Sequence, residues 1–228
     1  MSTTPKITVT LNGPYLIEGD LPLTHQHVVT NEAGESLDWR AGQDVAHGDS
    51  YSLCRCGKSR KKPFCDGSHA RARFDGTETA SHAPYERQAQ RTDGPTLVLE
   101  DAEKLCAFAR FCDPHGQVWN LVGRSDDPRA AALVVEEAGH CPSGRLVAKR
   151  RGHREAIEPG LAPSIGLIQD TAQAVSGGIW ARGGIPVVSA AGYAYEVRNR
   201  VTLCRCGASR NKPFCDGSHA SIRFTDRD

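Results

Sequence analysis

The sequence predicts an α+β protein in which a short β-rich unit occurs twice, with a smaller α+β segment between the two copies. First, a segment with three cysteines and one histidine is repeated almost unchanged 150 positions further along the chain. Second, apolar and polar residues alternate ahead of the first copy and are interrupted by Gly and Pro, which is typical of short strands joined by tight turns. Third, the intervening residues carry apolar side chains at helical spacing.

Composition and charge narrow the class of protein. The 228 residues include 28 basic and 27 acidic residues, a net charge of +1, so we expect no general attraction to nucleic acid or to an anionic membrane. The first residues, MSTTPKITVT, lack the features of a signal peptide, and no stretch approaches about 18 consecutive apolar residues. We therefore expect a soluble, cytoplasmic protein that binds neither nucleic acid nor a membrane.

The chain holds nine cysteines, which in a cytoplasmic protein favour metal or redox chemistry over disulfides. Their grouping is more informative than their number, because they fall into three sets of three and leave none over for a disulfide. The sets are Cys54, Cys56 and Cys65; Cys106, Cys112 and Cys141; and Cys204, Cys206 and Cys215.

The first repeat unit is expected at residues 5–75 and the second at 164–226. Residues 7–23 alternate around Gly13-Pro14 and Gly19-Asp20, and we expect a β-hairpin there. A weaker echo extends the repeat ahead of the cysteines, and the first copy carries about fourteen extra residues around 25–39. The echo matches Leu16, Gly19, Leu21, Pro22 and Leu23 to Trp180, Gly183, Ile185, Pro186 and Val187.

The central unit is expected at residues 92–160, between linkers at 76–95 and 155–164. Ser125 or Asp126 is the expected helix cap in this unit, because Pro128 suits an early helical position and the apolar face begins after it. The expected elements are a strand at 96–99, a helix within 100–111, a helix at 125–139 and a strand at 146–149.

The repeated segment reads LCRCGKSRKKPFCDGSH at 53–69 and LCRCGASRNKPFCDGSH at 203–219. Thiols and an imidazole so close together indicate a metal site. The first two cysteines are separated by one residue, whereas structural zinc sites usually have two to four, so the spacing favours iron–sulfur and leaves zinc as the alternative. We interpret the basic run Lys58, Arg60, Lys61 and Lys62 as a solvated loop face or as a field that steadies an anionic cluster.

Both segments resemble the CDGSH, or NEET, iron–sulfur family, whose pattern is Cys-x-Cys-x2-(Ser/Thr)-x3-Pro-x-Cys-Asp-Gly-(Ser/Ala/Thr)-His. Every specified position is met in both copies. The resemblance implies one [2Fe-2S] cluster per copy, and because single-motif members form twofold dimers, it implies a monomer with an intramolecular pseudo-dimer. The implied ligands are Cys54, Cys56, Cys65 and His69 in the first copy, and Cys204, Cys206, Cys215 and His219 in the second.

The histidine ligand predicts distinctive redox behaviour. Replacing a thiolate by a neutral imidazole reduces the negative charge at a cluster and raises its potential. Because free imidazole titrates near about 6.5, His69 and His219 are expected to couple proton gain to reduction or to cluster release.

The central cysteines resemble half of a bacterial ferredoxin site, with Ala109 in the place of one cysteine. Three ligands, Cys106, Cys112 and Cys141, predict a [3Fe-4S] cluster, whereas a [4Fe-4S] cluster would need His115, Asp113 or solvent as a fourth ligand. The stretch CPSGRL at 141–146 also resembles divergent, single-cluster ferredoxin-like domains found near CDGSH motifs. The alternative is three reduced, buried cysteines without a cluster.

The sequence contains no motif that indicates nucleotide binding or hydrolase chemistry. The phosphate-loop, dinucleotide and Gly-x-Ser-x-Gly patterns are missing, and His25 and His27 are expected to be surface histidines. We expect an electron carrier rather than an enzyme, with an unidentified redox protein or cluster acceptor as its partner. The alternatives are a cluster storage or transfer protein, a redox or pH sensor, and a structural metal-held module.

Overall fold

The first copy of the repeat begins with the expected hairpin. In the computed structural model, which describes residues 4–226, strand β1 (Lys6–Val9) pairs antiparallel with β2 (Tyr15–Glu18). Strand β5 (Tyr51–Leu53) pairs with β2 and leads into the first cysteine loop, and helix α1 (Ser68–Arg71) follows that loop. The alternation sends Ile7, Val9, Tyr15 and Ile17 into the core.

The second copy repeats this arrangement. Strand β9 (Ser164–Asp170) pairs antiparallel with β10 (Val175–Arg182), and β10 pairs with β12 (Arg200–Leu203), which leads into the second cysteine loop and helix α4 (Ser218–Ser221). Leu16 lies opposite Ser52 and Trp180 opposite Thr202, so the two hairpins occupy equivalent places as the sequence echo predicts.

The two copies exchange strands. Strand β3 (Leu23–Thr30) of the first copy pairs parallel with β9 of the second, while β11 (Val187–Val188) of the second pairs parallel with β1 of the first. The exchange is symmetric in detail, because the Ile7 amide donates to the Pro186 carbonyl at 2.9 Å and the Ile165 amide to the Pro22 carbonyl at 2.8 Å. This reciprocal pairing confirms the intramolecular pseudo-dimer.

Each main sheet therefore contains strands of both copies. One has the order β11-β1-β2-β5 and the other β12-β10-β9-β3-β4, where β4 (Ser36–Asp44) forms a hairpin with β3. The extra residues of the first copy make up this hairpin. A single apolar core unites the copies, since it joins Ile7, Tyr15 and Leu53 to Ile165 and Leu203.

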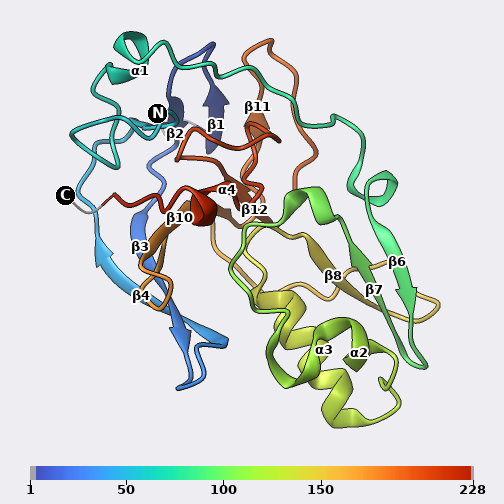
Figure 1. Ribbon diagram of the computed structural model, residues 1–228. Coiled ribbons are helices and arrows are strands. Elements are labelled where there is room, and N and C mark those ends of the chain that lie inside the picture. The colour runs from blue at the N-terminus through green and yellow to red at the C-terminus, as the bar shows by residue number, and fades with distance from the viewer. Residues whose placement is uncertain (1–3, 227–228) are drawn as a thin grey trace.

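The central unit forms a third sheet, of order β6-β7-β8, with its own apolar core. It lies to one side of the two copies, and α1 stands at the far end of the molecule from it (Figure 1). No helix within residues 4–226 is both long and apolar enough to cross a membrane. The elements of the central unit are β6 (Gln90–Asp93), β7 (Leu97–Asp101), β8 (Leu146–Arg150), α2 (Val118–Val122) and α3 (Pro128–His140), and 3-10 turns are formed by Tyr85–Arg87, Glu103–Leu105 and Pro114–Gly116.

Two details of the central prediction are wrong. The helix expected within 100–111 is absent: β7 extends to Asp101, a 3-10 turn follows, and Phe108 and Arg110 have φ angles of 53° and 63°, which break any helix. Arg110 is held by the carboxylate of Asp170 at 2.6 Å, so this loop is shaped by the second copy. The cap of α3 is Asp127, whose carboxylate accepts from the Arg129 amide.

Candidate metal centres

The first cysteine loop brings its four predicted ligands together as two pairs. The sulfur atoms of Cys54 and Cys56, just after β5, are 3.7 Å apart, and the Cys65 sulfur is 3.3 Å from Nδ1 of His69 in α1. The loop between them is braced by its own side chains. The Asp66 carboxylate accepts from two backbone amides of the loop at 2.9 Å each, which ties the two pairs into one rigid turn.

The second loop has the same geometry because it has nearly the same sequence. Cys204 and Cys206 are 3.7 Å apart at their sulfur atoms, and the Cys215 sulfur is 3.4 Å from Nδ1 of His219. Asp216 accepts from backbone amides at 2.9 and 3.0 Å, as Asp66 does in the first loop.

The first two thiols of each loop share a proton. The hydrogen bond from Cys56 lowers the pKa of Cys54 to about 6, and the pKa of Cys56 rises correspondingly. In the second loop the hydrogen bond from Cys206 lowers the pKa of Cys204 to about 7. A thiol that gives up its proton this readily is suited to bind metal as a thiolate.

These donors fit a binuclear iron–sulfur cluster. Each loop offers soft thiolates and one imidazole as two separate pairs, which is two donors for each of two irons. Within residues 4–226, no three His, Cys, Asp or Glu side chains converge on a site for a single ion. All nine cysteines are free of disulfides.

A buried arginine beside each loop escaped the sequence analysis. Arg55 is 1% exposed, and its guanidinium donates to the carbonyls of Gly13, Gly76 and Thr10 at 2.8–2.9 Å. Arg205 takes the equivalent place in the second copy. Both stand between the first two cysteines in the sequence, which is the signal that identifies them.

Arg205 is 3% exposed and pairs with Asp226, and it also donates to the Gly177 and Ile168 carbonyls. Each loop therefore carries a buried positive charge on the residue between its first two cysteines. Such a charge offsets the negative charge that metal-bound thiolates bring into the interior.

The two loops meet at the pseudo-twofold axis of the molecule. Cys56 and Cys206 form an antiparallel backbone bridge across it. Gly57 and Gly207 have φ angles of 71° and 84°, and a Cβ on either would lie 2.5 or 2.6 Å from the carbonyl oxygen of the opposite cysteine. Only glycine fits this contact. Tyr15 adds a second link, since its hydroxyl donates to the Cys204 carbonyl at 2.8 Å.

The central cysteines lie in two different segments of the chain. Cys141 is the C-terminal cap of α3, Cys106 lies in the loop where a helix was expected within 100–111, and Cys112 follows directly after that range. Burial raises the pKa of Cys112, and the nearby charges of Asp113, Cys141 and Cys106 raise it further, so the three thiols lie within electrostatic reach of one another.

Two charged groups surround these thiols. Arg145 forms an ion pair of 2.6 Å with Asp101; burial lowers its pKa, but this pair and the Cys106 side chain raise it overall. Of the two side chains suggested as a fourth ligand, Asp113 has its carboxylate 3.7 Å from the Cys112 sulfur, whereas Nδ1 of His115 is engaged by Glu137 at 3.0 Å.

The central site abuts the second loop rather than the first. A Cβ on Gly217 would lie 3.2 Å from the Phe108 Cβ and 3.4 Å from the Cys106 carbonyl oxygen, whereas a Cβ on Gly67, its counterpart, would have no neighbour within 4 Å. Asn211 also donates to the Lys104 carbonyl at 2.8 Å.

This one-sided contact makes the two loops unequal in their exposure. Cys215 and His219 are 2% and 3% exposed, and burial lowers the pKa of His219 to about 4. Cys65 and His69 are both partly exposed. The first site is therefore the more open of the two.

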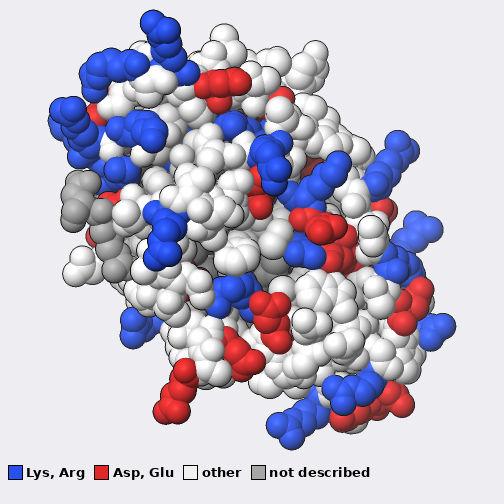
Figure 2. Space-filling model, viewed as in Figure 1, with Lys and Arg blue, Asp and Glu red and all other residues white. Residues whose placement is uncertain are grey.

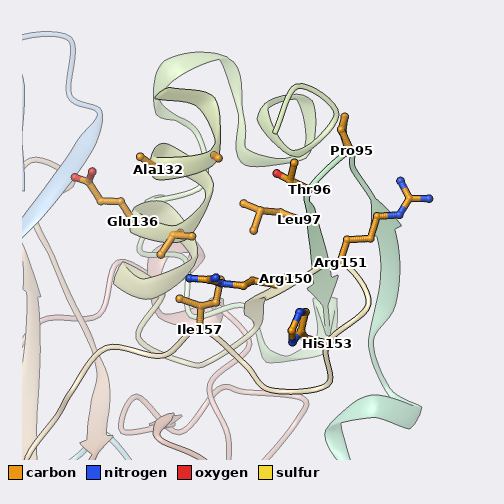
Figure 3. Close-up of a pocket in the computed structure, with 11 residues that line it drawn as sticks. Pro95, Thr96, Leu97, Ala132, Glu136, Arg150, Arg151, His153 and Ile157 are labelled. Carbon is orange, nitrogen blue, oxygen red and sulfur yellow. The ribbon is translucent and has the colours of Figure 1, made fainter. Parts of the chain in front are cut away.

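One cavity has a volume of about 950 Å³. It lies between α3 and the edge of β7 and β8, where Leu97, Arg150 and Ile157 line it (Figure 3). A cavity of about 710 Å³ beside the first loop is lined by His25 and His27, which are half-buried. No cysteine lines either cavity.

Comparison with protein families identifies all three segments. Residues 12–70 and 176–220 match the model of the iron-binding zinc finger of CDGSH type, and residues 92–151 match the model of a divergent 4Fe-4S mono-cluster. Searches of curated proteins and of solved structures gave no match. The two CDGSH-type matches contain all the donors of the two loops, and the central match contains all three central cysteines.

Proposed function

The chain carries two CDGSH-type iron-binding segments on either side of a divergent 4Fe-4S segment, and from this we propose that it is an electron-transfer protein with three iron–sulfur sites. Each CDGSH-type loop would hold a [2Fe-2S] cluster and the central cysteines a [3Fe-4S] cluster. Bound there, the clusters would supply one-electron redox sites.

The observation that carries this proposal is the contiguity of the three donor sets. The backbones of Cys56 and Cys206 pair directly, and the Cys106 carbonyl lies against Gly217 of the second loop. Three separate storage sites have no need to touch, whereas a relay does. The contacts support an order in which the second loop stands between the first loop and the central site.

Residues around the loops are suited to tuning such sites. The Lys58 amide donates to the Cys56 sulfur at 3.4 Å, and the Ala208 amide to the Cys206 sulfur at 3.5 Å. Hydrogen bonds to sulfur, and the buried Arg55 and Arg205 charges of the same loops, stabilise extra negative charge, which favours reduction.

Metal analysis and spectroscopy test the proposal. We expect about seven irons per chain, two for each [2Fe-2S] site and three for the centre, with a three-iron paramagnetic resonance signal in the oxidised protein. All three sites should be reduced reversibly by a reductase. Colourless protein that holds zinc without iron or sulfide, or clusters that accept no electron, would contradict it.

The nuclearity of the central site has a sharp alternative. Asp113, next to the Cys112 sulfur, is better placed than His115 to be the fourth ligand of a [4Fe-4S] cluster. In that case we expect about eight irons per chain and no three-iron signal. Asp113→Ala would then convert the centre to the three-iron form, but it leaves the spectrum unchanged if the centre is [3Fe-4S] already.

Cluster transfer is the second candidate, and the open first site favours it. Cys65 and His69 are partly exposed, so an acceptor has access to them that it lacks at Cys215 and His219. Incubation with an apo-ferredoxin distinguishes the two functions: iron and sulfide move to the acceptor in cluster transfer, whereas in electron transfer all clusters stay with the chain. Proton coupling at the two histidines stays a prediction.

A further inference from the structure

The two cysteine loops differ in charge far more than in sequence. Segments 53–74 and 203–224 are identical except at four positions. At three of the four, the first copy has a basic residue and the second a neutral one. These pairs are Lys58 and Ala208, Lys61 and Asn211, and Arg71 and Ser221.

The second loop, which lacks these three basic residues, is the one that the rest of the chain covers. The Thr79 and Ala80 amides both donate to the Lys212 carbonyl, at 2.8 and 2.9 Å, and the central unit contacts Asn211 and Gly217. Neutral residues at these positions suit an intramolecular contact.

The basic loop is uncovered. Lys58, Arg60, Lys61, Arg71 and Arg73 are all exposed, and we call this set the basic rim. Figure 2 shows Lys and Arg side chains gathered over α1 and the loop before it, at the end of the molecule away from the central sheet in Figure 1.

Two acidic side chains beside the rim, Asp66 and Asp75, offset only part of its charge. The Asp66 carboxylate accepts from the Arg60 and Ser68 amides, and that of Asp75 accepts from the Thr77 amide at 2.9 Å. Both carboxylates shape turns of the backbone and remain charged, so the five basic residues of the rim exceed them by three. The rim therefore presents a net positive face around the most open pair of donors, Cys65 and His69.

We propose that the basic rim is the docking surface for an acidic electron-transfer protein. The inference rests on the proposed function and adds where the partner binds and which charge it carries. A positive rim speeds the encounter with a negative partner and orients it toward Cys65 and His69, where the covering layer is thinnest. In the second loop, the equivalent Cys215 and His219 are only 2% and 3% exposed, so a partner has no such access to them.

Nucleic acid is the less favoured occupant of the rim. The net charge of the chain is only +1, and segment 53–74 exposes no large aromatic side chain on which a base could stack. A compact positive patch around a redox site matches a protein partner of similar size better than an extended polyanion.

The chain itself offers the variants for a charge-matched test. Lys58→Ala with Lys61→Asn gives the first loop the residues that the second loop already carries in the same fold. The control, Arg210→Ala with Arg223→Ala, removes the same two charges from exposed positions of the second loop. Both are made in the full iron-loaded chain, and retention of the visible spectrum verifies folding.

The probe is a plant-type [2Fe-2S] ferredoxin of net negative charge, with basic cytochrome c as the opposite probe. Binding is measured by titration at low ionic strength, and electron exchange by stopped flow over a range of salt concentrations. We expect the first-loop variant to bind the ferredoxin about tenfold more weakly than the parent and to exchange electrons with it about tenfold more slowly. Its rate of electron exchange should also depend less on salt concentration. The second-loop control should match the parent within about twofold.

The outcomes separate this inference from the proposed function. If the protein is redox-active but its two variants react alike, the rim is not the docking surface. The same holds if the redox-active protein does not bind the ferredoxin at all. Either result leaves the electron-transfer proposal standing. Protein that binds ferredoxin through the rim but exchanges no electrons overturns the proposed function alone. If the first-loop variant loses binding to duplex DNA but not to ferredoxin, the rim is a nucleic-acid site and the inference is wrong.

Discussion

Gly57→Ala is expected to weaken the junction of the two cysteine loops without touching a predicted ligand. The backbone at Gly57 has φ +71°, and a new Cβ would lie 2.5 Å from the Cys206 carbonyl oxygen and 3.2 Å from the Cys206 Cα. Both contacts are with backbone atoms of the opposite loop. Neither a rotamer change nor a flexible side chain relieves them.

The magnitude follows from two contributions. Alanine in the left-handed region costs about 1–2 kcal/mol relative to glycine. Forcing apart a packed backbone contact adds about 1–3 kcal/mol. Together they predict a loss of about 2–5 kcal/mol, a large share of the roughly 5–15 kcal/mol by which domains of ordinary stability are held folded.

Gly67→Ala is the matched control. Gly67 has φ +81°, close to that of Gly57, but a Cβ there has no neighbour within 4 Å. It therefore carries the backbone cost alone, about 1–2 kcal/mol. Guanidinium unfolding of the iron-loaded protein, followed by far-ultraviolet circular dichroism and by visible absorption, gives the two free energies. Equal losses in the two variants would refute the contact at the pseudo-twofold axis.

Three further predictions concern buried polar groups. Tyr15→Phe removes a donor from the Cys204 carbonyl and should lower the free energy of unfolding by about 1–3 kcal/mol, measured by denaturant titration with an unchanged visible spectrum. Arg200→Met should cost about 3–5 kcal/mol, because the fully buried guanidinium pairs with Glu158 and binds carbonyls of the central unit; a loss under 1 kcal/mol would contradict this. Burial raises the pKa of Glu137 to about 7 from its ordinary 4.5, so the folded state binds the extra proton and the free energy of unfolding should fall as pH rises through that window. Glu137→Gln should flatten this fall in unfolding experiments between pH 5 and 8, and an unchanged slope would count against it.

Local sequence was sufficient to predict the turns that carry the candidate ligands. The pairing of Cys54 with Cys56 and of Cys65 with His69 depends on residues inside one loop, so spacing alone indicates it. The leading hairpins were predictable for the same reason. The match of Leu16 to Trp180 placed both strands correctly.

Features set by distant residues escaped prediction. The segment around Phe108 has helical spacing, but Phe108 is 42% exposed and packs on the second loop, while Arg110 is drawn to Asp170. The β3-β4 hairpin was read only as an insertion. Its Trp39 packs in tilted contacts against Phe111 and Trp180, with ring centres 4.8 and 4.7 Å away, contacts that no local pattern encodes.

The unequal exposure of the two loops could not be predicted from the sequences of the loops themselves. Nearly identical segments cannot indicate which of them will be covered, because the cover comes from Lys104, Phe108 and the linker. Only the differences at Lys58, Lys61 and Arg71 are related to the unequal exposure, and they can be interpreted only when the neighbouring segments are known.

The strand exchange has a consequence for how such a molecule can diverge. In a twofold dimer of identical chains, each substitution appears twice, so a surface cannot be gained on one side without its twin on the other. Here β3 and β11 cross between halves that share one polypeptide. The halves are always present in equal number and at a very high mutual concentration, which needs no dimerisation to maintain it. The backbone keeps its pseudo-twofold symmetry, while the side chains of each half can change independently of the other half.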